Sequence, residues 1–235
     1  MQVYSITDKG LRKPVNQDRF VVKKFQDGSN LIAVADGLSG QPAGDTAAEI
    51  ARQCVTAANQ DVPDIESHLV QLVHACDEKI LQTAKKRPAL AGMGTTLTVA
   101  FIKDTTVYWA HIGNCRLYLC RGEMFLQVTK DDTLAAYLLA EGKLTPEQAR
   151  RDPSRHGLFE CLGHGYAEVK SGRFSIQKGD LLLLSSDGLH DEISEENIHA
   201  ILKSDDDLKN KMNRLVHASL DEGGSDNITA VGVYI

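Results

Sequence analysis

The sequence has no stretch that would span a membrane and too little positive charge to hold nucleic acid. Its longest apolar runs fall far short of the roughly 20 residues that a transmembrane helix needs. The N-terminus, Met1 to Tyr4, lacks the positive and apolar regions of a signal peptide. The formal charge is −6, with no basic stripe to offset it. We therefore expect a soluble, cytoplasmic protein that binds neither a membrane nor nucleic acid.

The sequence contains no cysteine or histidine motif of the kind that binds zinc or carries redox chemistry. The five cysteines are odd in number and form no C-x-x-C pair, so we expect reduced, mostly buried thiols. None of the eight histidines belongs to an H-E-x-x-H motif. No Pro/Gly/Ser-rich linker divides the chain, and 42% hydrophobic residues can fill a core. Residues 1–235 are therefore expected to form a single domain.

What the sequence does contain is a set of aspartates at the edges of apolar strands. The apolar runs and their acids are 31–35 with Asp36, 181–184 with Asp187, and 228–235 with Asp226. A continuous apolar run is typical of a strand buried on both faces, and its end is aimed out of the core. An Asp-Gly pair after a strand is most often a turn, but the repetition favours one shared site.

A predicted hairpin brings a fourth acid to the same place. Residues 20–22 and 31–35 are expected to be strands, with the turn signal Asp27 to Asn30 between them. Asp18 precedes the first strand and Asp36 follows the second. Antiparallel pairing would therefore put both carboxylates at the same end.

The rest of the pattern predicts strands in two runs, each with a pair of amphipathic helices. The expected helices are 43–59, 64–86, 194–203 and 207–220, and the further strands are 3–7, 95–102, 107–112, 115–120, 124–128, 169–176, 181–185 and 228–235. The four strands between 95 and 128 are expected to form one antiparallel meander. Residues 131–163 have a polar, helical pattern with a capping box at Thr145 to Gln148, which we interpret as a mobile flap insert. This order predicts an α+β sandwich.

The acids suit hard divalent cations, because Mg²⁺ and Mn²⁺ prefer oxygen ligands. Asp36, Asp187, Asp226 and the carbonyl of Gly37 meet that need. Two ions about 3.5–4 Å apart that share an aspartate would activate a water molecule for attack on a phosphoryl group. Such a site needs no nucleophilic side chain.

Six short motifs follow one another in an order that resembles a known family. They are Asn16-Gln17-Asp18, Val34-Ala35-Asp36-Gly37, Gly94-Thr95-Thr96, Gly113-Asn114-Cys115-Arg116, Ser186-Asp187-Gly188-Leu189 and Gly224-Ser225-Asp226-Asn227-Ile228-Thr229. Over nearly the whole chain they resemble the PP2C-type (PPM) metal-dependent protein phosphatases, in their bacterial single-domain form. The resemblance implies a four-layer α-β-β-α sandwich, with two antiparallel sheets flanked by helix pairs and two Mn²⁺ or Mg²⁺ ions at one end. It also implies hydrolysis of phosphoserine and phosphothreonine in proteins by a metal-activated bridging water, as part of signal transduction.

The resemblance also assigns roles to individual residues. Asp36 would bridge both metals, and the Gly37 carbonyl would bind the second. Asp187 and Asp226 would hold the first metal. Asp18 would be a further ligand or would orient a water molecule bound to metal. We expect Asn227 to fix the loop that carries Asp226, because asparagine readily closes turns with its own side chain.

Several positions depart from the family pattern. Lys13 stands where an arginine usually grips the substrate phosphate, so either Lys13 holds the phosphate as a point charge or the neighbouring Arg12 reaches in. Asn114 replaces an acid that helps to bind a third metal in related bacterial enzymes, which argues against a third site. Leu38 stands where some relatives have a histidine that could protonate the leaving group. A metal-bound water is then the simplest acid, with His190 as a substitute.

Two smaller departures are Ser39, where glycine is common, and Asp132, where histidine is common. Asp131 and Asp132 are best explained as the acidic first turn of a helix.

Other functions remain open at this point. A non-catalytic PP2C-like module that binds phosphoproteins is suggested by Lys13, Asn114 and Ser39. A serine hydrolase could use Ser39, Ser185 or Ser186, but the G-x-S-x-G motif is missing. A metal-dependent nuclease should show basic residues along a groove. We expect an active phosphatase, monomeric, acting on proteins phosphorylated by a Ser/Thr kinase.

Overall fold

Two antiparallel sheets form the centre of the computed structural model, which describes residues 1–40, 43–60, 62–165 and 167–235. The first sheet has the strand order β2-β3-β4-β5-β8 and the second the order β1-β10-β9-β6-β7. The first sheet consists of β2 (Arg19–Lys24), β3 (Asn30–Ala35), β4 (Leu97–Lys103), β5 (Thr106–Ile112) and β8 (Lys170–Ser175). The second consists of β1 (Gln2–Asp8), β6 (Arg116–Arg121), β7 (Met124–Gln127), β9 (Leu181–Ser185) and β10 (Ile228–Tyr234).

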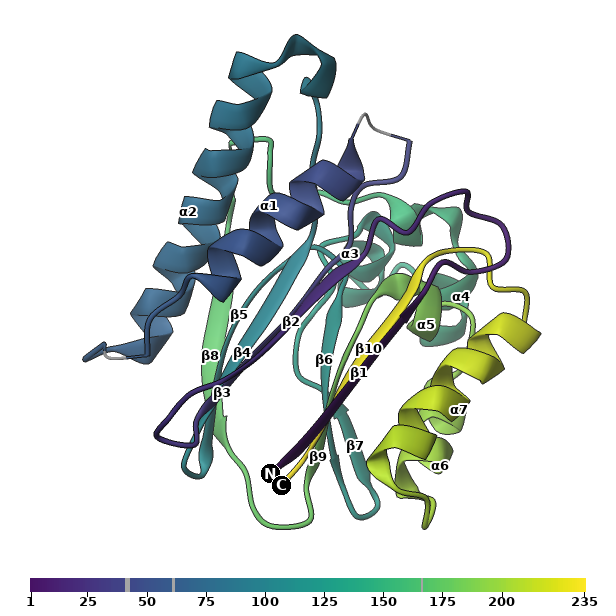
Figure 1. Cartoon of the computed structure of the whole chain (residues 1–235). Helices are drawn as coiled ribbons and strands as arrows, with labels where there is room; N and C mark the ends of the chain where they lie inside the picture. Colours follow the sequence, from purple (N-terminus) through teal and green to yellow (C-terminus); the bar gives the residue numbers. More distant parts are fainter. Residues whose placement is uncertain (41–42, 61, 166) are drawn as a thin grey trace.

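Helix pairs cover the two outer faces of the sandwich (Figure 1). The helices are α1 (Gly44–Thr56) and α2 (Ile65–Lys86) on the first sheet, and α6 (Glu195–Lys203) and α7 (Leu208–Asp221) on the second. Asp64, Ser194 and Asp207 begin three of these helices by accepting a backbone N–H with their side chains. The predicted four-layer sandwich is confirmed. In the described ranges, no helix is long and apolar enough to cross a membrane.

The strands that lead to the acids are buried on both faces, as their apolar runs predict. In β3, Leu31 and Ala33 pack in the cluster under α1 and α2, whereas Ile32 and Val34 pack between the two sheets. The side chains of β9 (Leu181–Ser185) alternate in the same way between the helix side and the space between the sheets. Because each strand contributes to two cores, nearly every position must be apolar.

The predicted four-stranded meander is wrong. β4 pairs with β5 and β6 pairs with β7, but β5 and β6 belong to different sheets. Gly113 connects them with a φ of 104°, and a Cβ at this position would lie 2.5 Å from the Thr96 side chain. Since all these strands are apolar on both faces, their pattern does not reveal which strand is the neighbour. β6 pairs instead with β9, far away in the sequence.

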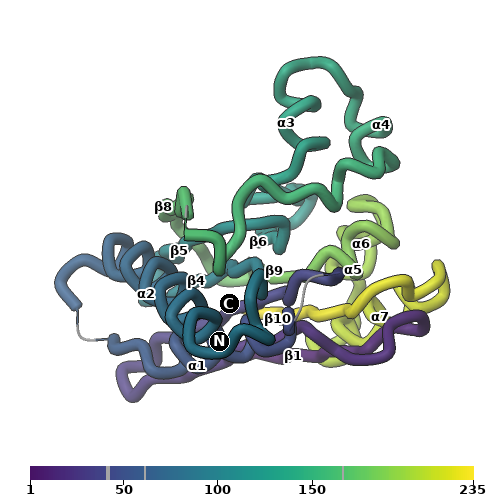
Figure 2. Tube along the Cα trace, turned by 90° about the horizontal axis from the view of Figure 1, so that it is seen from above, coloured from purple at the N-terminus to yellow at the C-terminus, as the bar shows by residue number. Residues whose placement is uncertain are grey.

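The predicted flap contains α3 (Leu134–Ala140), α4 (Pro146–Arg151) and a 3-10 turn at Pro153–His156. Figure 2 shows α3 and α4 standing away from the two sheets. The Thr145–Gln148 capping box is confirmed at the start of α4. A second 3-10 turn, at Pro88–Leu90, follows α2.

The interpretation of Asp131 and Asp132 as the acidic first turn of a helix is wrong. Thr133 caps α3, so both acids precede the helix. Asp131 forms an ion pair with Arg116 at 2.7 Å, and Asp132 accepts a hydrogen bond from the Gly113 backbone N at 2.9 Å. The two acids therefore fasten the base of the flap to β6 and to the crossing between the sheets.

Candidate metal centre

The predicted hairpin brings two of the acids together at one end of the first sheet. Arg19 pairs with Ala35 in the ladder between β2 and β3, so Asp18 and Asp36 lie immediately beyond this pair. The Asp36 backbone is fixed by Thr96, because Asp36 N donates to Thr96 Oγ1 at 3.1 Å and Asp36 O accepts from Thr96 N at 2.9 Å. The sequence argument from antiparallel pairing is confirmed.

The other two acids come from the second sheet. Asp187 begins the short helix α5 (Asp187–His190), just after β9 ends. Asp226 lies just before β10 begins, and β9 and β10 are antiparallel neighbours. The end of one strand and the start of its neighbour therefore lie at the same edge.

Asp18 ties the two sheets together at this edge. Its Oδ2 accepts hydrogen bonds from Ser186 Oγ and Thr229 Oγ1, both at 2.7 Å. Its Oδ1 is buried and has no hydrogen-bond partner among the described residues. Burial raises the pKa of Asp18 to about 6, helped by the charge of Asp187 and opposed by these two hydrogen bonds.

Asp36 experiences the crowding of the acids most strongly. Burial raises its pKa well above the usual range, and the charges of Asp18, Asp187 and Asp226 raise it further. These carboxylates, from four separate segments, are therefore close enough to repel one another. A bound cation would remove that repulsion.

Asp187 is buried, and its two oxygens differ in their surroundings. Oδ2 accepts a hydrogen bond from Asn114 Nδ2 at 3.0 Å. Oδ1 is buried with no hydrogen-bond partner in the part of the chain that the structure describes. Asn114, whose neutral side chain argued against a third metal, thus acts here as a donor to Asp187.

Asp226 is partly exposed, and Lys13 contacts it directly. Lys13 Nζ lies 2.8 Å from Asp226 Oδ2 and donates to Ser39 Oγ, also at 2.8 Å. Arg12 is exposed, and its guanidinium lies near Gly223. Of the two candidate phosphate-binding residues, the structure therefore brings Lys13 to the acids.

Gly37 is required by close packing. A Cβ at Gly37 would lie 2.4 Å from the carbonyl oxygen of Gly44, at the start of α1. Its φ lies outside the left-handed region, because none of the positive-φ residues is Gly37. The absence of a side chain at Gly37 is therefore what the fold needs.

Asn227 holds the loops around the site, as expected. Its Nδ2 donates to Lys9 O at 2.8 Å and to Val15 O at 3.0 Å, and its Oδ1 accepts from Gln17 N at 2.8 Å. One side chain thus connects the start of β10 with the loop that carries Lys13.

The donor set fits hard divalent cations. Its side-chain donors are carboxylates, the kind of oxygen ligand that Mg²⁺ and Mn²⁺ prefer. Buried oxygens of Asp18 and Asp187 lack a partner in the described ranges, so they have capacity left for coordination. The raised pKa values of Asp18 and Asp36 arise from burial and mutual repulsion, which a cation would reverse.

His190 does not have the properties of a catalytic acid. It is buried, and its Nδ1 lies 2.9 Å from Ser185 Oγ. Burial lowers the pKa of His190 to about 3, so the ring is neutral at physiological pH. His190 is best explained as a structural residue at the end of α5.

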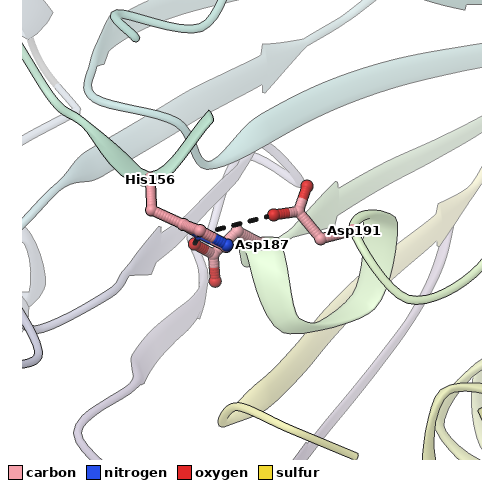
Figure 3. A group of neighbouring side chains, drawn as sticks. All are labelled: His156, Asp187 and Asp191. Atoms are coloured by element: carbon pink, nitrogen blue, oxygen red, sulfur yellow. Dashed lines mark ion pairs between the residues drawn. The ribbon is translucent and has the colours of Figure 1, made fainter. Parts of the chain in front are cut away.

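Two further residues beside Asp187 were not among the predicted site residues. His156, from the flap, has its Nδ1 3.8 Å from Asp187 Oδ2 and 3.6 Å from Asp191 Oδ2 (Figure 3). Burial, with the charge of Asp187, raises the pKa of Asp191 to about 7. The i, i+4 spacing of Asp187 and Asp191 was a usable signal, but nothing in the local sequence pointed to His156.

Comparisons with known proteins show the family to which the chain belongs. The sequence profile of the family described as Protein phosphatase 2C matches residues 11–230. The chain is 35% identical over 235 residues to Protein phosphatase PhpP of Streptococcus pneumoniae serotype 2 (strain D39 / NCTC 7466), covering 97% of this chain and 95% of that protein.

Solved structures are similar over almost the same extent. The serine/threonine phosphatase of S. agalactiae has a TM-score of 0.91 at 28% identity, covering 100% of this chain and 99% of that one. The catalytic domain of the serine threonine protein phosphatase PstP, in complex with two manganese ions, has a TM-score of 0.86 at 32% identity, with coverages of 98% and 96%. The chain therefore belongs to the protein phosphatase 2C family and is a serine/threonine protein phosphatase.

Proposed function

We propose that this phosphatase removes phosphate from phosphoserine and phosphothreonine in proteins with two Mn²⁺ or Mg²⁺ ions. The proposed ligands are Asp36 to both ions, the Gly37 carbonyl to the second, and Asp187 and Asp226 to the first. Asp18 would either join them or orient the attacking water. The observation that carries this proposal is the convergence of carboxylates from four segments at one sandwich edge, where burial and the charges of the other three acids raise the pKa of Asp36 well above the usual range.

When bound, the two ions would lower the pKa of a shared water and neutralise charge on the phosphoryl group. The chain supplies orientation and charge around them. Asp18 is held rigidly by Ser186 and Thr229, so it can fix the direction of a water molecule. Leu38 carries no titratable group and His190 is neutral. Neither residue therefore donates a proton to the leaving group.

Lys13 is the proposed phosphate-binding residue, in place of Arg12. Its ammonium lies beside Asp226 at the exposed side of the cluster, where a substrate phosphate would approach. Lysine offers a point charge without the planar fork of arginine. We therefore expect weaker orientation of the phosphate than an arginine would give, with binding dominated by charge.

We further propose that the chain is one phosphatase domain with a flap at 131–163. It would act as a monomer in cytoplasmic signal transduction on the products of a Ser/Thr kinase. All five cysteines are free thiols, which agrees with a reducing compartment.

Phosphate release from a phosphothreonine peptide with added Mn²⁺ tests the proposed function. Asp36→Asn and Asp226→Asn should each lower kcat/KM at least about 100-fold, because a bound ion contributes several kcal/mol to transition-state stabilisation. Asp221→Asn, at an exposed position on α7, is the matched control and should keep full activity. Circular dichroism must show all three variants folded.

Persisting turnover in both site variants would contradict the proposed metal centre. A wild-type protein that binds phosphopeptides but does not turn over p-nitrophenyl phosphate with Mn²⁺ would instead favour the non-catalytic module.

A further inference from the structure

Two apolar side chains are exposed on the loop that carries Lys13. This loop, residues 9–18, connects β1 with β2 at the catalytic end of the sandwich (dark purple in Figure 1). Leu11 is 66% exposed and Val15 is 54% exposed, and the value for Leu11 is the highest among the large apolar side chains of described position. Single exposed apolar residues are ordinary, but these two lie two positions before and two positions after the proposed phosphate-binding lysine.

The backbone of this loop is fixed, although the two side chains are exposed. Leu11 N donates to Gly224 O at 2.8 Å. Asn227 Nδ2 donates to Val15 O at 3.0 Å and to Lys9 O at 2.8 Å. Because these bonds hold the loop at several points, the apolar side chains belong to a preorganised surface, which loses little conformational freedom when a partner binds.

The loop packs directly against the segment that carries Asp226. A Cβ at Gly10 would lie 2.1 Å from the Asp226 carbonyl oxygen, and Leu11 Cγ would lie 3.1 Å from a Cβ at Gly224. Lys13 Nζ is 2.8 Å from Asp226 Oδ2. Leu11 therefore borders the proposed metal centre on the same side as the cation that would meet the substrate phosphate.

We propose that Leu11 and Val15 form a surface that binds apolar side chains next to the phosphorylated residue of a protein substrate. This inference rests on the proposed function, in which Lys13 binds the substrate phosphate. It narrows the substrate class to proteins whose phosphoserine or phosphothreonine is flanked by apolar residues.

The dimensions of a polypeptide chain support this pairing. Two residues of backbone span at most about 7 Å, so the Cα atoms of Leu11 and Val15 lie no farther than that from the Cα of Lys13. The same limit holds in a substrate between the phosphorylated residue and its neighbours two positions away. With the phosphate at Lys13, neighbouring side chains come within reach of the two exposed side chains. Contact would remove apolar surface of both partners from water, which favours binding.

A preference for acidic neighbours is the alternative, because Lys9 and Arg12 lie on the same loop. Lys9 Nζ is already engaged, since it donates to Lys13 O at 2.8 Å. The Arg12 guanidinium and the Glu192 carboxylate both approach the same point beside Gly223, so an acid of the chain itself offsets the charge of Arg12. The exposed apolar surface is therefore the stronger basis for selectivity.

Three phosphothreonine peptides test the proposal. They differ only in the two residues on each side of the phosphothreonine, which are leucine, serine or glutamate. For each, kcat/KM with Mn²⁺ is divided by the value for p-nitrophenyl phosphate, which has no peptide. The wild type should favour the leucine peptide over the serine peptide about fivefold, the order that partial burial of leucine side chains supplies.

Variants of the loop assign this preference to the two residues. Leu11→Ser and Val15→Ser should each reduce it at least about twofold, and the double variant should abolish it. Leu11→Met, which keeps an apolar side chain of similar size, should retain it. Val22→Ser, at a 41% exposed position in the middle of β2, is the matched control and should also retain it.

Three results would overturn the proposed surface. They are equal kcat/KM for the leucine and serine peptides in the wild type, a preference for the glutamate peptide, and a leucine preference that persists in the double variant.

Fluorescence anisotropy with the Asp36→Asn variant measures the same preference without turnover. The leucine peptide should bind about fivefold more tightly than the serine peptide, and adding Leu11→Ser together with Val15→Ser should remove the difference. If the wild type released no phosphate but this binding preference were found, the phosphatase mechanism would fail and the apolar surface would stand. Turnover of all three peptides without preference would overturn the surface alone.

Discussion

Lys13 Nζ lies 2.8 Å from Asp226 Oδ2, so the proposed phosphate-binding cation contacts a proposed metal ligand. In this arrangement the ammonium provides part of the positive charge that the acids require. A metal ion that binds Asp226 must share or displace Lys13. The freed ammonium could then face the substrate phosphate.

This contact predicts opposite effects of Lys13→Met on metal and on substrate. Apparent Mn²⁺ affinity should rise a few-fold, because the tethered cation no longer competes for Asp226. KM for a phosphopeptide should rise roughly tenfold, the scale of one charge-assisted hydrogen bond. Calorimetric Mn²⁺ titration and steady-state kinetics measure the two effects. Lys24→Met, exposed on β2, is the control. If Lys13→Met weakened the binding of Mn²⁺ as well as that of the phosphopeptide, Lys13 would not compete with the metal for Asp226.

Asp18 predicts a stability that depends on pH in the metal-free protein. Because burial raises its pKa from 3.8 to about 6, the folded protein keeps a proton that the unfolded chain has released. This contribution is fully present below pH 3.8 and is lost as pH rises through 6. The loss is about 3 kcal/mol at most, from ~1.4 kcal/mol per unit of pKa.

Urea unfolding in EDTA between pH 4 and 7 measures this effect. The wild type should lose stability relative to Asp18→Asn across that range, and Mn²⁺ should abolish the difference in slope. Parallel stability curves for the two proteins in EDTA would show that Asp18 titrates normally.

Asn114→Asp should create the additional metal site that the wild-type sequence argues against. The new carboxylate would lie beside Asp187 Oδ2, where the amide now donates at 3.0 Å. Without metal, the like charges should destabilise the fold by about 1–3 kcal/mol. With millimolar Mn²⁺, the number of bound ions per chain should increase by one.

Metal analysis after gel filtration in Mn²⁺ buffer counts these ions. Asn114→Ala removes the same hydrogen bond without adding charge and should not gain an ion. An equal count in the Asp and Ala variants would show that charge at position 114 does not determine the number of ions.

Gly188→Ala tests the close packing beneath the acids. A Cβ at Gly188 would lie 2.1 Å from the carbonyl oxygen of Asn227, so the loop that carries Asp226 must move. We expect a loss of about 1–3 kcal/mol in stability and weaker Mn²⁺ binding. Helix propensity alone predicts the opposite sign, because alanine favours α5 over glycine. A higher melting temperature in the variant would therefore show that the loop carrying Asp226 can move without loss of stability.

The sequence was most informative where the physical requirement is local. A strand buried on both faces must be apolar throughout, so the runs ending at Asp36 and Asp187 were visible. The pairing of β2 with β3 followed from a short turn. The partners of β6 could not be predicted, because strands apolar on both faces carry no mark of their neighbour. The approach of His156 to Asp187 depends on how the flap folds back, which no local pattern records.

Two details of the site also required coordinates. Gly37 is needed because Gly44 O would lie 2.4 Å from a Cβ, a contact between segments that the Asp-Gly pattern does not reveal. The choice between Lys13 and Arg12 depends on which side of the loop faces Asp226. Neighbouring residues in a loop have no fixed periodicity, so the sequence left both open.

Asp18 and Asp36 extend from one sheet, and Asp187 and Asp226 from the other. Ions bound at this edge would link the two sheets to each other and hold them together. A ligand that binds only the folded state stabilises it in proportion to the logarithm of its free concentration. The metal supply of the cell would then govern how long the protein survives as well as how fast it works.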